Sequence, residues 1–429
     1  MALLAFAAAP TQTAAAAAGM VTAGAAKVAI DVPQGTPLGG YGAFARRLPF
    51  PDVLGRYAHA FWFRPHEGRD GELAARALVL GSGDRRFVWI AADLLAVDAE
   101  LTTEVERRLA RALGAPVTLL LSASHTHSGP GAYGTSEILG ALVVDRPDGI
   151  VRDGIVRALV EAARSADRRR VPARVGAARG TVADLTRPRL RSPVDPEVIV
   201  LKVADLDGRA IAVVWNFAIH PTMLGPRSRV LSADVTGIAS RALEDALGVP
   251  VLFVNGAVGD VSPRRHGHAA MKEVGAMLAR TAEALAARAE PRDVDPPAAA
   301  TVHVTLGRPS LTLGHCLRGW LPRGIGLPAG LVFPSDTTLT AVAIGDAAVV
   351  TIPGELQSSL GRRIKEAAGA TRPNTVVAGL SNGYLGYFVD RESFRTAAYV
   401  TCANLYGEDG GERLTAAATA LLRGLGETR

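Results

Sequence analysis

The sequence predicts an α/β fold with a mixed β-sheet core flanked by helices and an active site at the carboxyl ends of strands. Short apolar runs rich in β-branched residues alternate with longer amphipathic patterns, which favours alternating strands and helices. Five of the predicted strands end in a turn that carries Gly or Pro and a side chain suited to catalysis or metal binding. Ligands of open α/β sheets bind at strand carboxyl ends, so these turns predict where the site lies.

Each predicted strand is an apolar run bounded by turn residues. These strands are Phe87–Ala92, Val117–Ser122, Val198–Val203, Ile211–Phe217, Val249–Val254, Ala341–Ile352 and Thr375–Ala378. The first predicted helix, Asp98–Leu113, has acidic residues early and arginines late, as the helix dipole favours. The other predicted helices are Gly149–Ala166, Gly237–Leu247, Ala269–Ala289, Leu356–Ala368 and Gly411–Leu425.

Composition indicates a globular protein and excludes some partners. The chain has 429 residues, of which 48% are hydrophobic and 21% charged, and its formal net charge is +6. The cationic residues are mostly arginines, scattered along the chain with no basic block interleaved with aromatics, so no nucleic-acid partner is predicted. Beyond residue 26 no uncharged apolar stretch reaches 18 residues, which predicts no transmembrane helix and at most peripheral membrane contact. The oligomeric state stays open.

The first 26 residues carry no charged side chain and are expected to be a signal peptide or a disordered Ala-rich leader. Ala2–Pro10 resembles a short apolar signal region, but no positive segment precedes it, and Met20 is an alternative start. A cleaved signal would make the protein secreted or periplasmic; without one it would be cytoplasmic. Residues 27–429 are expected to form one catalytic domain, in which Glu290–Ala300 reads as a surface connection.

Cys316 and Cys402 are the only two cysteines. They do not form a CxxC pair and are too few for a disulfide framework. One bridge between them is an alternative, but the sequence favours two unpaired thiols.

The strand-end turns carry residues with the chemistry of a metal site. His125 and His127 form an H-x-H pair, His220 ends an apolar strand, and Glu355 follows a Pro-Gly turn. Each residue alone has an ordinary structural explanation. Together, two imidazole nitrogens and a carboxylate oxygen suit Zn²⁺ with one position open. Such an ion lowers the pKa of a bound water to about 7 and polarises a carbonyl, which predicts hydrolysis of an amide.

Ser262 lies in the turn sequence Gly-Asp-Val-Ser-Pro. No G-x-S-x-G elbow is present to mark it as a nucleophile. Three roles stay open: nucleophile, hydrogen-bond donor to the substrate or attacking water, and an ordinary turn serine.

Several motifs occur along most of the chain in one order. They are PLGGYG (37–42), SHTHSGPG (124–131), VDPEVIVLKVAD (194–205), NFAIHPT (216–222), SADVTG (232–237), NGAVGDVSP (255–263), PGE (353–355) and GLSNGYLGY (379–387), with a later Tyr399. In these motifs the sequence resembles the neutral/alkaline non-lysosomal ceramidase family. The resemblance implies a zinc amidase that hydrolyses N-acylsphingosine to fatty acid and sphingosine with a zinc-bound water.

The resemblance also implies roles for single residues. Its motif positions imply the zinc ligands His125, His220, Glu355 and Tyr387, with Tyr384 as the alternative tyrosine.

His127 and Tyr399 would surround the scissile carbonyl, and Ser262 matches the family's active-site serine. A family arginine corresponds to Arg187, with Arg189 and Arg191 as alternatives.

Departures from the family pattern put the substrate in question. The family's C-terminal β-sandwich domain is expected to be absent, and Arg264 stands where the family commonly has Asn. Trp320–Phe333 is apolar and is interpreted as a lid, an acyl-chain wall or an ordinary buried loop. The alternative function is therefore a zinc amidase or amide-forming enzyme for a peptide or specialised metabolite. A non-catalytic binding module is the third hypothesis.

Overall fold

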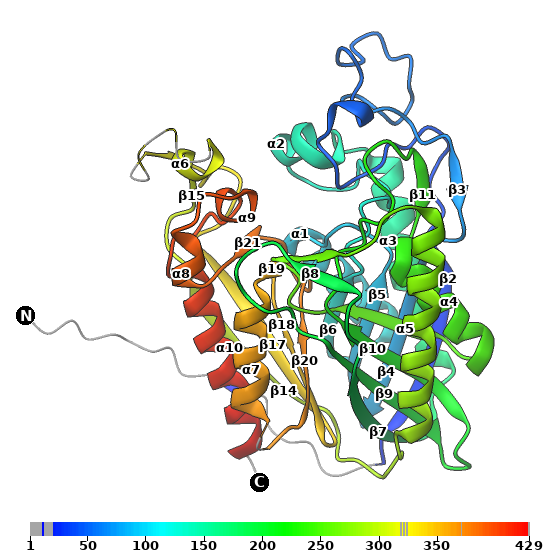
Figure 1. The fold of residues 1–429 in the computed structure, drawn as a ribbon. Coiled ribbons are helices and arrows are strands. Elements are labelled where there is room, and N and C mark those ends of the chain that lie inside the picture. Colours follow the sequence, from blue (N-terminus) through cyan, green and yellow to red (C-terminus); the bar gives the residue numbers. More distant parts are fainter. Residues whose placement is uncertain are drawn as a thin grey trace, which may run out of the picture.

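The computed structural model describes residues 11–12, 20–317, 320, 322, 325–369 and 371–427, and it contains two large β-sheets (Figure 1). An eight-stranded sheet has the order β12-β10-β9-β7-β2-β4-β5-β6, and a five-stranded sheet has the order β1-β14-β17-β18-β20. The strands of the larger sheet are β2 (Thr22–Ala29), β4 (Ala74–Ser82), β5 (Arg85–Ala92), β6 (Val117–Ala123), β7 (Val171–Thr181), β9 (Glu197–Asp205), β10 (Ala210–Phe217) and β12 (Val251–Asn255). Those of the smaller sheet are β1 (Thr11–Gln12), β14 (Ala298–Thr305), β17 (Asp336–Ile344), β18 (Ala347–Thr351) and β20 (Asn374–Ala378).

Long helices cover the outer faces of both sheets, and short elements gather at one end (Figure 1). The long helices are α1 (Ala99–Leu113), α3 (Gly149–Arg168), α4 (Asp234–Leu247), α5 (His268–Arg288), α7 (Ser358–Ala368) and α10 (Gly410–Glu427). The short helical elements are η1 (Phe44–Arg46), α2 (Glu137–Leu139), η2 (Gly140–Val144), α6 (Leu313–Cys316), α8 (Arg391–Phe394) and α9 (Tyr399–Cys402). The short strands are β3 (Gly68–Asp70), β8 (Thr186–Pro188), β11 (Val230–Ser232), β13 (Val261–Pro263), β15 (Ser310–Thr312), β16 (Gly326–Pro328), β19 (Glu355–Leu356) and β21 (Tyr387–Phe388).

The predicted α/β class with a mixed sheet is confirmed, although the strands divide between two sheets. Three strand pairs, β5–β6, β10–β12 and β18–β20, run parallel, and their crossovers contain α1, α4 and α7. The remaining pairs within the two large sheets are antiparallel. One predicted strand, Ala341–Ile352, is wrong as a single element. It bends back at Gly345, whose φ of 61° suits a tight turn, and forms the end of β17 and all of β18.

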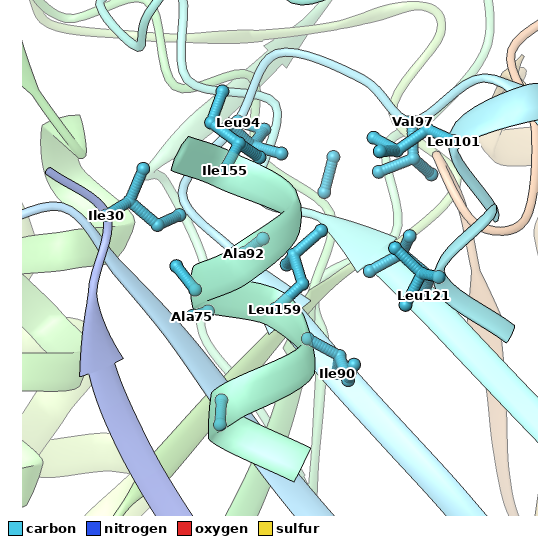
Figure 2. Close-up of a cluster of buried hydrophobic side chains, with 14 of the residues drawn as sticks. Ile30, Ala75, Ile90, Ala92, Leu94, Val97, Leu101, Leu121, Ile155 and Leu159 are labelled. Carbon is cyan, nitrogen blue, oxygen red and sulfur yellow. The ribbon is translucent and has the colours of Figure 1, made fainter. Parts of the chain in front are cut away.

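Only two residue pairs join β2 to β7, so the larger sheet consists of two halves, β12-β10-β9-β7 and β2-β4-β5-β6, with a short connection. One apolar cluster is therefore enclosed by both halves of this sheet and by the five-stranded sheet, with Leu78, Trp89, Leu201, Val349 and Val376 among its members. On the outer face, Ile155 and Leu159 of α3 pack over β-strand residues such as Ile90 (Figure 2). Separate clusters lie under α4–α5 and under α7–α10.

The expected boundary between leader and domain at residue 26 does not fit the structure. Thr22–Ala29 form β2, which pairs along its whole length with β4. Within the expected leader, residues 1–10 and 13–19 lie outside the described residues. Thr11 and Gln12 pair with β14. None of the helices in the described ranges is long and apolar enough to cross a membrane.

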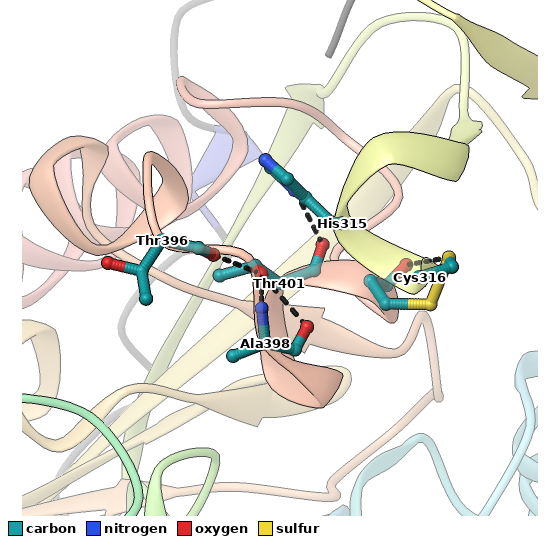
Figure 3. Close-up of a disulfide and its surroundings, with 6 residues drawn as sticks. His315, Cys316, Thr396, Ala398 and Thr401 are labelled. Atoms are coloured by element: carbon teal, nitrogen blue, oxygen red, sulfur yellow. Dashed lines mark hydrogen bonds between the residues drawn. A yellow bond between two sulfur atoms is a disulfide. The ribbon is translucent and has the colours of Figure 1, made fainter. Parts of the chain in front are cut away.

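The prediction of two unpaired thiols is wrong, because Cys316 and Cys402 form a disulfide (Figure 3). The two cysteines are separated by 86 positions, and the fold brings α6 against α9. Because this contact is made only in the tertiary structure, cysteine spacing carried no signal for it.

Candidate functional site

Three histidines meet where β6 and β10 end. His125 and His127 follow β6, and His220 follows β10. The Nε2 atom of His125 lies 3.1 Å from Nε2 of His220 and 3.4 Å from Nε2 of His127. One nitrogen from each of the three rings lies within 4.8 Å of the others, so the group could hold a metal ion. His125 and His220 are buried and His127 is partly buried.

The hydrogen bonds of two rings fix where their lone pairs point. Nδ1 of His125 lies 2.8 Å from the Leu95 carbonyl oxygen, and Nδ1 of His220 lies 3.4 Å from that of Val258. A carbonyl oxygen only accepts, so both Nδ1 atoms donate and both Nε2 atoms carry a lone pair. Such carbonyl contacts are the usual way a protein orients metal-binding imidazoles.

Glu355, the first residue of β19, adds a carboxylate to this pair. Its Oε2 atom lies 3.4 Å from Nε2 of His125 and 3.6 Å from Nε2 of His220. This oxygen is buried and has no hydrogen-bond partner among the described residues. Two lone pairs and a carboxylate oxygen repel one another unless a cation lies between them. The donor set therefore fits a divalent metal, and its nitrogen and oxygen chemistry suits zinc.

The backbone at His125 is strained, with φ of 70°, a value that non-glycine residues rarely adopt. Asn255 at the end of β12 holds this turn and the next one together. Its Nδ2 donates to the carbonyl oxygens of Ser124 at 3.0 Å and Ile219 at 2.9 Å, the residues that precede His125 and His220. Sequence reasoning noted the motif containing Asn255 but gave the side chain no role. Its position directly after a predicted buried strand could have indicated that this side chain has a role at the site.

Gly40 and Arg46 position His127 from the other side. A Cβ atom on Gly40 would lie 2.7–2.9 Å from atoms of His127, so only glycine fits there. The Arg46 guanidinium donates to the His127 carbonyl oxygen at 2.6 Å, and burial lowers the pKa of Arg46 to about 10. Burial, followed by the electrostatic effects of His125 and Arg189, lowers the pKa of His127 well below its ordinary value. The His127 imidazole is therefore neutral at neutral pH.

Two tyrosines surround the carboxylate. Tyr384 donates from its hydroxyl to Oε1 of Glu355 at 2.8 Å. Burial and then the charge of Glu355 raise the pKa values of Tyr384 and Tyr387 well above the ordinary value. For Glu355 itself, burial would raise the pKa, but the electrostatic effect of the nearby His125 and then the hydroxyl of Tyr387 outweigh burial and lower the pKa. The ring of Tyr399 lies 5.8 Å from that of Tyr387, measured between centroids.

Arg189, not Arg187, is the arginine at the site. Nε of Arg189 donates to Oγ of Ser262 at 2.7 Å, and Nη1 donates to the Tyr387 hydroxyl at 3.5 Å. Arg187 pairs with Ser262 through the backbone of β8 and β13, but its side chain is exposed, as is Arg191. The structure therefore brings the side chain of Arg189, and not that of Arg187, to the candidate site. In a strand, side chains at 187, 189 and 191 would point to the same face, so the alternation of faces along a strand could not distinguish the three arginines.

A cavity of about 940 Å³ lies beside this site. Two residues connect it to the metal-binding group, because Tyr384 bonds Glu355 and the Leu95 carbonyl bonds His125. Its lining includes Tyr133, Leu385 and Phe333, the last residue of the apolar segment Trp320–Phe333. Phe333 packs against the cluster under α7 and α10. Polar and charged side chains such as Asp98, Glu106 and Asp336 also line it, so the cavity offers a mixed surface beside the metal-binding group.

Comparison with known proteins places this geometry in a family. The model of the neutral/alkaline non-lysosomal ceramidase N-terminal region matches residues 65–283, just over half of the chain. This span includes the three histidines, Arg189 and Ser262; Glu355 and the tyrosines lie beyond it.

Comparison with individual proteins agrees with the match to the family model. The chain is 26% identical to neutral ceramidase B of Dictyostelium discoideum over 221 residues and 27% identical to the neutral ceramidase of Pseudomonas aeruginosa over 214 residues. These alignments cover 45% and 44% of this chain but only 31% of each relative.

Two solved structures share the fold. One is described as "Ceramidase complexed with C2", with a TM-score of 0.79 and 19% identity, and the other is the neutral ceramidase from Pseudomonas aeruginosa, with a TM-score of 0.77 and 21% identity. Each comparison covers 95% of this chain and 75% of the other. The chain belongs to the neutral/alkaline non-lysosomal ceramidase family.

Proposed function

We propose that this protein is a zinc-dependent amidohydrolase that cleaves a ceramide-like N-acyl lipid into a fatty acid and a sphingoid amine. The observation that carries the proposal is the buried group of two imidazole lone pairs and an unpartnered carboxylate oxygen, placed beside Arg189 and Ser262. The names of the relatives support the substrate class. The neighbouring cavity has a mixed lining, and its apolar members, such as Leu385 and Phe333, offer contacts to a hydrocarbon chain.

The metal would be held by His125, His220 and Glu355, with Tyr387 as the proposed fourth ligand and Tyr384 as the alternative. When bound, Zn²⁺ polarises an amide carbonyl and lowers the pKa of a water molecule to about 7. Tyr384 donates to Oε1 of Glu355, which leaves Oε2 for the metal. Because Tyr384 bonds one carboxylate oxygen and leaves the other for the metal, this arrangement favours Tyr384 as the residue that orients Glu355, rather than as a metal ligand.

The side chains around the metal-binding group would stabilise charge, transfer protons and bind the substrate. Arg189 and Tyr399 would stabilise the negative charge that develops on the carbonyl oxygen. His127 is neutral and can take a proton from the attacking water and return one to the leaving amine. Ser262 accepts a hydrogen bond from the Arg189 cation, which cannot serve as its base, so its own hydroxyl proton is available for the substrate. This contact favours a hydrogen-bonding role for Ser262 over a nucleophilic one.

The first test compares the zinc-loaded wild type with His220→Ala and with His303→Ala as a matched control. His303 lies on β14, its side chain is 53% exposed and pairs with Asp336, and it is not part of the metal-binding group. We expect His220→Ala to lose both bound zinc and the release of fatty acid from a medium-chain N-acylsphingosine, because one of three buried donors is gone. The control should keep both. Zinc is measured by elemental mass spectrometry and products by molecular mass spectrometry; a metal-free, fully active His220→Ala protein would contradict the proposal.

The same experiment tests the substrate separately from the metal. One zinc ion per wild-type chain without release of fatty acid would keep the metal site and reject the ceramide-like substrate. N-acyl peptides and the reverse, amide-forming reaction would then be tested on the same preparation.

We also propose that the protein works in an oxidising compartment, outside the cell or in a periplasm. The Cys316–Cys402 disulfide supports this location, because such bonds persist mainly in oxidising environments.

A further inference from the structure

One loop beside the site exposes large apolar side chains. We call residues 42–63 the tip loop. Within it Phe44 is 83% exposed, Phe50 82%, Val53 77% and Leu54 74%. Single exposed apolar residues are common, but several in one loop indicate a surface that meets an apolar partner.

The charges of the tip loop favour an anionic partner. Asp52 is its only acidic residue, while Arg47 and Arg56 lie on either side of the Phe50–Leu54 turn. The Asp52 carboxylate accepts the backbone N–H of Tyr57 at 2.7 Å, so this negative charge is used inside the loop. The Arg47 guanidinium is also used internally, since it donates to the carbonyl oxygens of Gly42, Ala141 and Leu142. Arg56 is exposed, so the loop presents apolar side chains together with this positive charge.

Buried contacts join the tip loop firmly to the site. The backbone N–H groups of Phe61, Trp62 and Phe63 all donate to the Asp145 carboxylate. Arg46, also in the loop, donates to the His127 carbonyl oxygen. The exposed side chains are thus fixed relative to the metal-binding group.

A second apolar segment lies across the site. We call the described part of residues 325–333 the hairpin lobe; it contains β16, which pairs with β15. Leu331 is 99% exposed and Leu327 is 52% exposed, so the interpretation of this segment as an ordinary buried loop does not fit. The chain just before it is tied to α9 by the Cys316–Cys402 disulfide, and α9 begins with Tyr399.

Both apolar segments project from the same end of the molecule (Figure 1). The tip loop is the blue loop above α2, and the hairpin lobe follows the α6–β15 region on the other side of that end. This end also holds β8, β19 and β21, which carry or adjoin the site residues.

We propose that the tip loop and the hairpin lobe together form a docking surface for a lipid bilayer with anionic headgroups. The inference rests on the proposed function for its reason, since a long-chain N-acyl lipid resides in a bilayer and exposing its chains to water is unfavourable. Apolar side chains would enter the boundary between headgroups and acyl chains, and the exposed Arg56 would contact lipid phosphates. Docking would place the site directly over the bilayer surface in which the substrate resides.

The test is flotation with vesicles of phosphatidylcholine and phosphatidylglycerol at a molar ratio of about 3:1, an anionic surface of the kind that attracts basic segments. The wild type is compared with the double variant Phe50→Ser/Leu54→Ser. The matched control is Leu206→Ser/Met277→Ser. Leu206 is 44% exposed in the turn between β9 and β10, and Met277 is 41% exposed on α5. Since β10 ends at the site, the turn at its start lies at the opposite end of the strand.

We expect the wild type and the control to float with the vesicles. The tip-loop variant should partition at least about tenfold more weakly, because burying one large apolar side chain is worth roughly that factor. Its zinc content and melting temperature should match the wild type, which shows that the loss is local. Vesicles of phosphatidylcholine alone should bind the wild type more weakly than the anionic ones.

Other results would overturn the surface without touching the proposed function. Hydrolysis of a vesicle-embedded N-acylsphingosine by a wild type that does not float would reject docking and keep the enzyme. Wild-type flotation unaffected by the tip-loop variant would also reject this surface. A lower oligomeric state of that variant in light scattering, with unchanged flotation, would assign the tip loop to contacts between copies. Flotation without hydrolysis would instead keep the surface and reject the substrate.

Discussion

The arginine at the site is selected by the backbone around it. The Arg189 N–H donates to the Asp260 carbonyl oxygen at 2.6 Å, just after β8 ends at Pro188. This contact directs the Arg189 side chain to Ser262, while Arg187 stays in the strand with its side chain exposed. Two residues of the same type, two positions apart, therefore have different surroundings.

This difference gives a matched pair of variants. Arg189→Ala should lower kcat/KM for the amide substrate by about 10²–10³-fold, because a charged donor near the developing oxyanion is lost. Arg187→Ala should stay close to the wild type. Steady-state kinetics with zinc content measured on each preparation makes the comparison. Equal losses in the two variants would show that Arg189 acts only through general surface charge.

Asn255 should affect metal binding without touching the metal. Its amide donates to the carbonyls before His125 and His220, and Asn255→Asp would turn those donors into acceptors facing two carbonyl oxygens. We expect zinc affinity to fall about 10–100-fold, as for other residues that orient metal ligands. Asn216→Asp is the control, since Asn216 also donates to a buried carbonyl, that of Val254, at 2.8 Å. Competition with a chelator measures both; the same loss of affinity in both variants would make the Asn255 effect one of stability alone.

The candidate metal-binding residues could be predicted from the sequence because they follow strand ends, where topology fixes proximity. His125, His220 and Glu355 each follow a strand, β6, β10 and β18, and they meet without any local sequence relation. The orienting residues were harder to predict. Gly40 and Arg46 come from loops whose course depends on tertiary contacts with His127.

At the scale of elements, strands with large apolar side chains were predictable and those with small ones were not. The predicted Phe87–Ala92 and Val117–Ser122 match β5 and β6 closely. In contrast, β2 reads Thr-Ala-Gly-Ala-Ala-Lys-Val-Ala, and its first five residues fell within the expected signal peptide or disordered Ala-rich leader. Alanine and glycine have little intrinsic strand preference, so β2 owes its conformation to pairing with β4. The sequence of β2 alone does not contain this information about its pairing partner.

The disulfide links two short helices, α6 and α9. It closes a loop of 86 positions between α6 and α9, and Tyr399 at the start of α9 lies against Tyr387. Cys316→Ser/Cys402→Ser should therefore lower the free energy of unfolding by about 2–4 kcal/mol and also reduce activity. The measurements are thermal unfolding and hydrolysis, with and without a phosphine reductant. The reductant should lower both in the wild type and change nothing further in the double variant; full activity in that variant would show that α9 is held by packing alone.

At the scale of the whole molecule, the site joins the two large sheets. His125 and His220 follow strands of the eight-stranded sheet, whereas Glu355 follows β18 of the five-stranded sheet. The loops after β6 and β20 are also hydrogen-bonded, since the Ala123 N–H donates to the Leu380 carbonyl oxygen at 3.0 Å. A metal held by ligands from both sheets binds the folded chain and not the unfolded one. Metal binding and global stability should therefore be coupled.

Removing zinc tests this coupling. At free zinc about 100-fold above the dissociation constant, ligand binding adds about 2.7 kcal/mol to the free energy of unfolding. Treatment with a chelator should therefore lower the melting temperature of the wild type and of His303→Ala by several degrees, and restoring zinc should reverse the change. His220→Ala should show no such shift, because its donor set is incomplete. A shift of the same size in His220→Ala would mean that the stabilising ion binds elsewhere, and the two sheets would then be joined by their packed core alone.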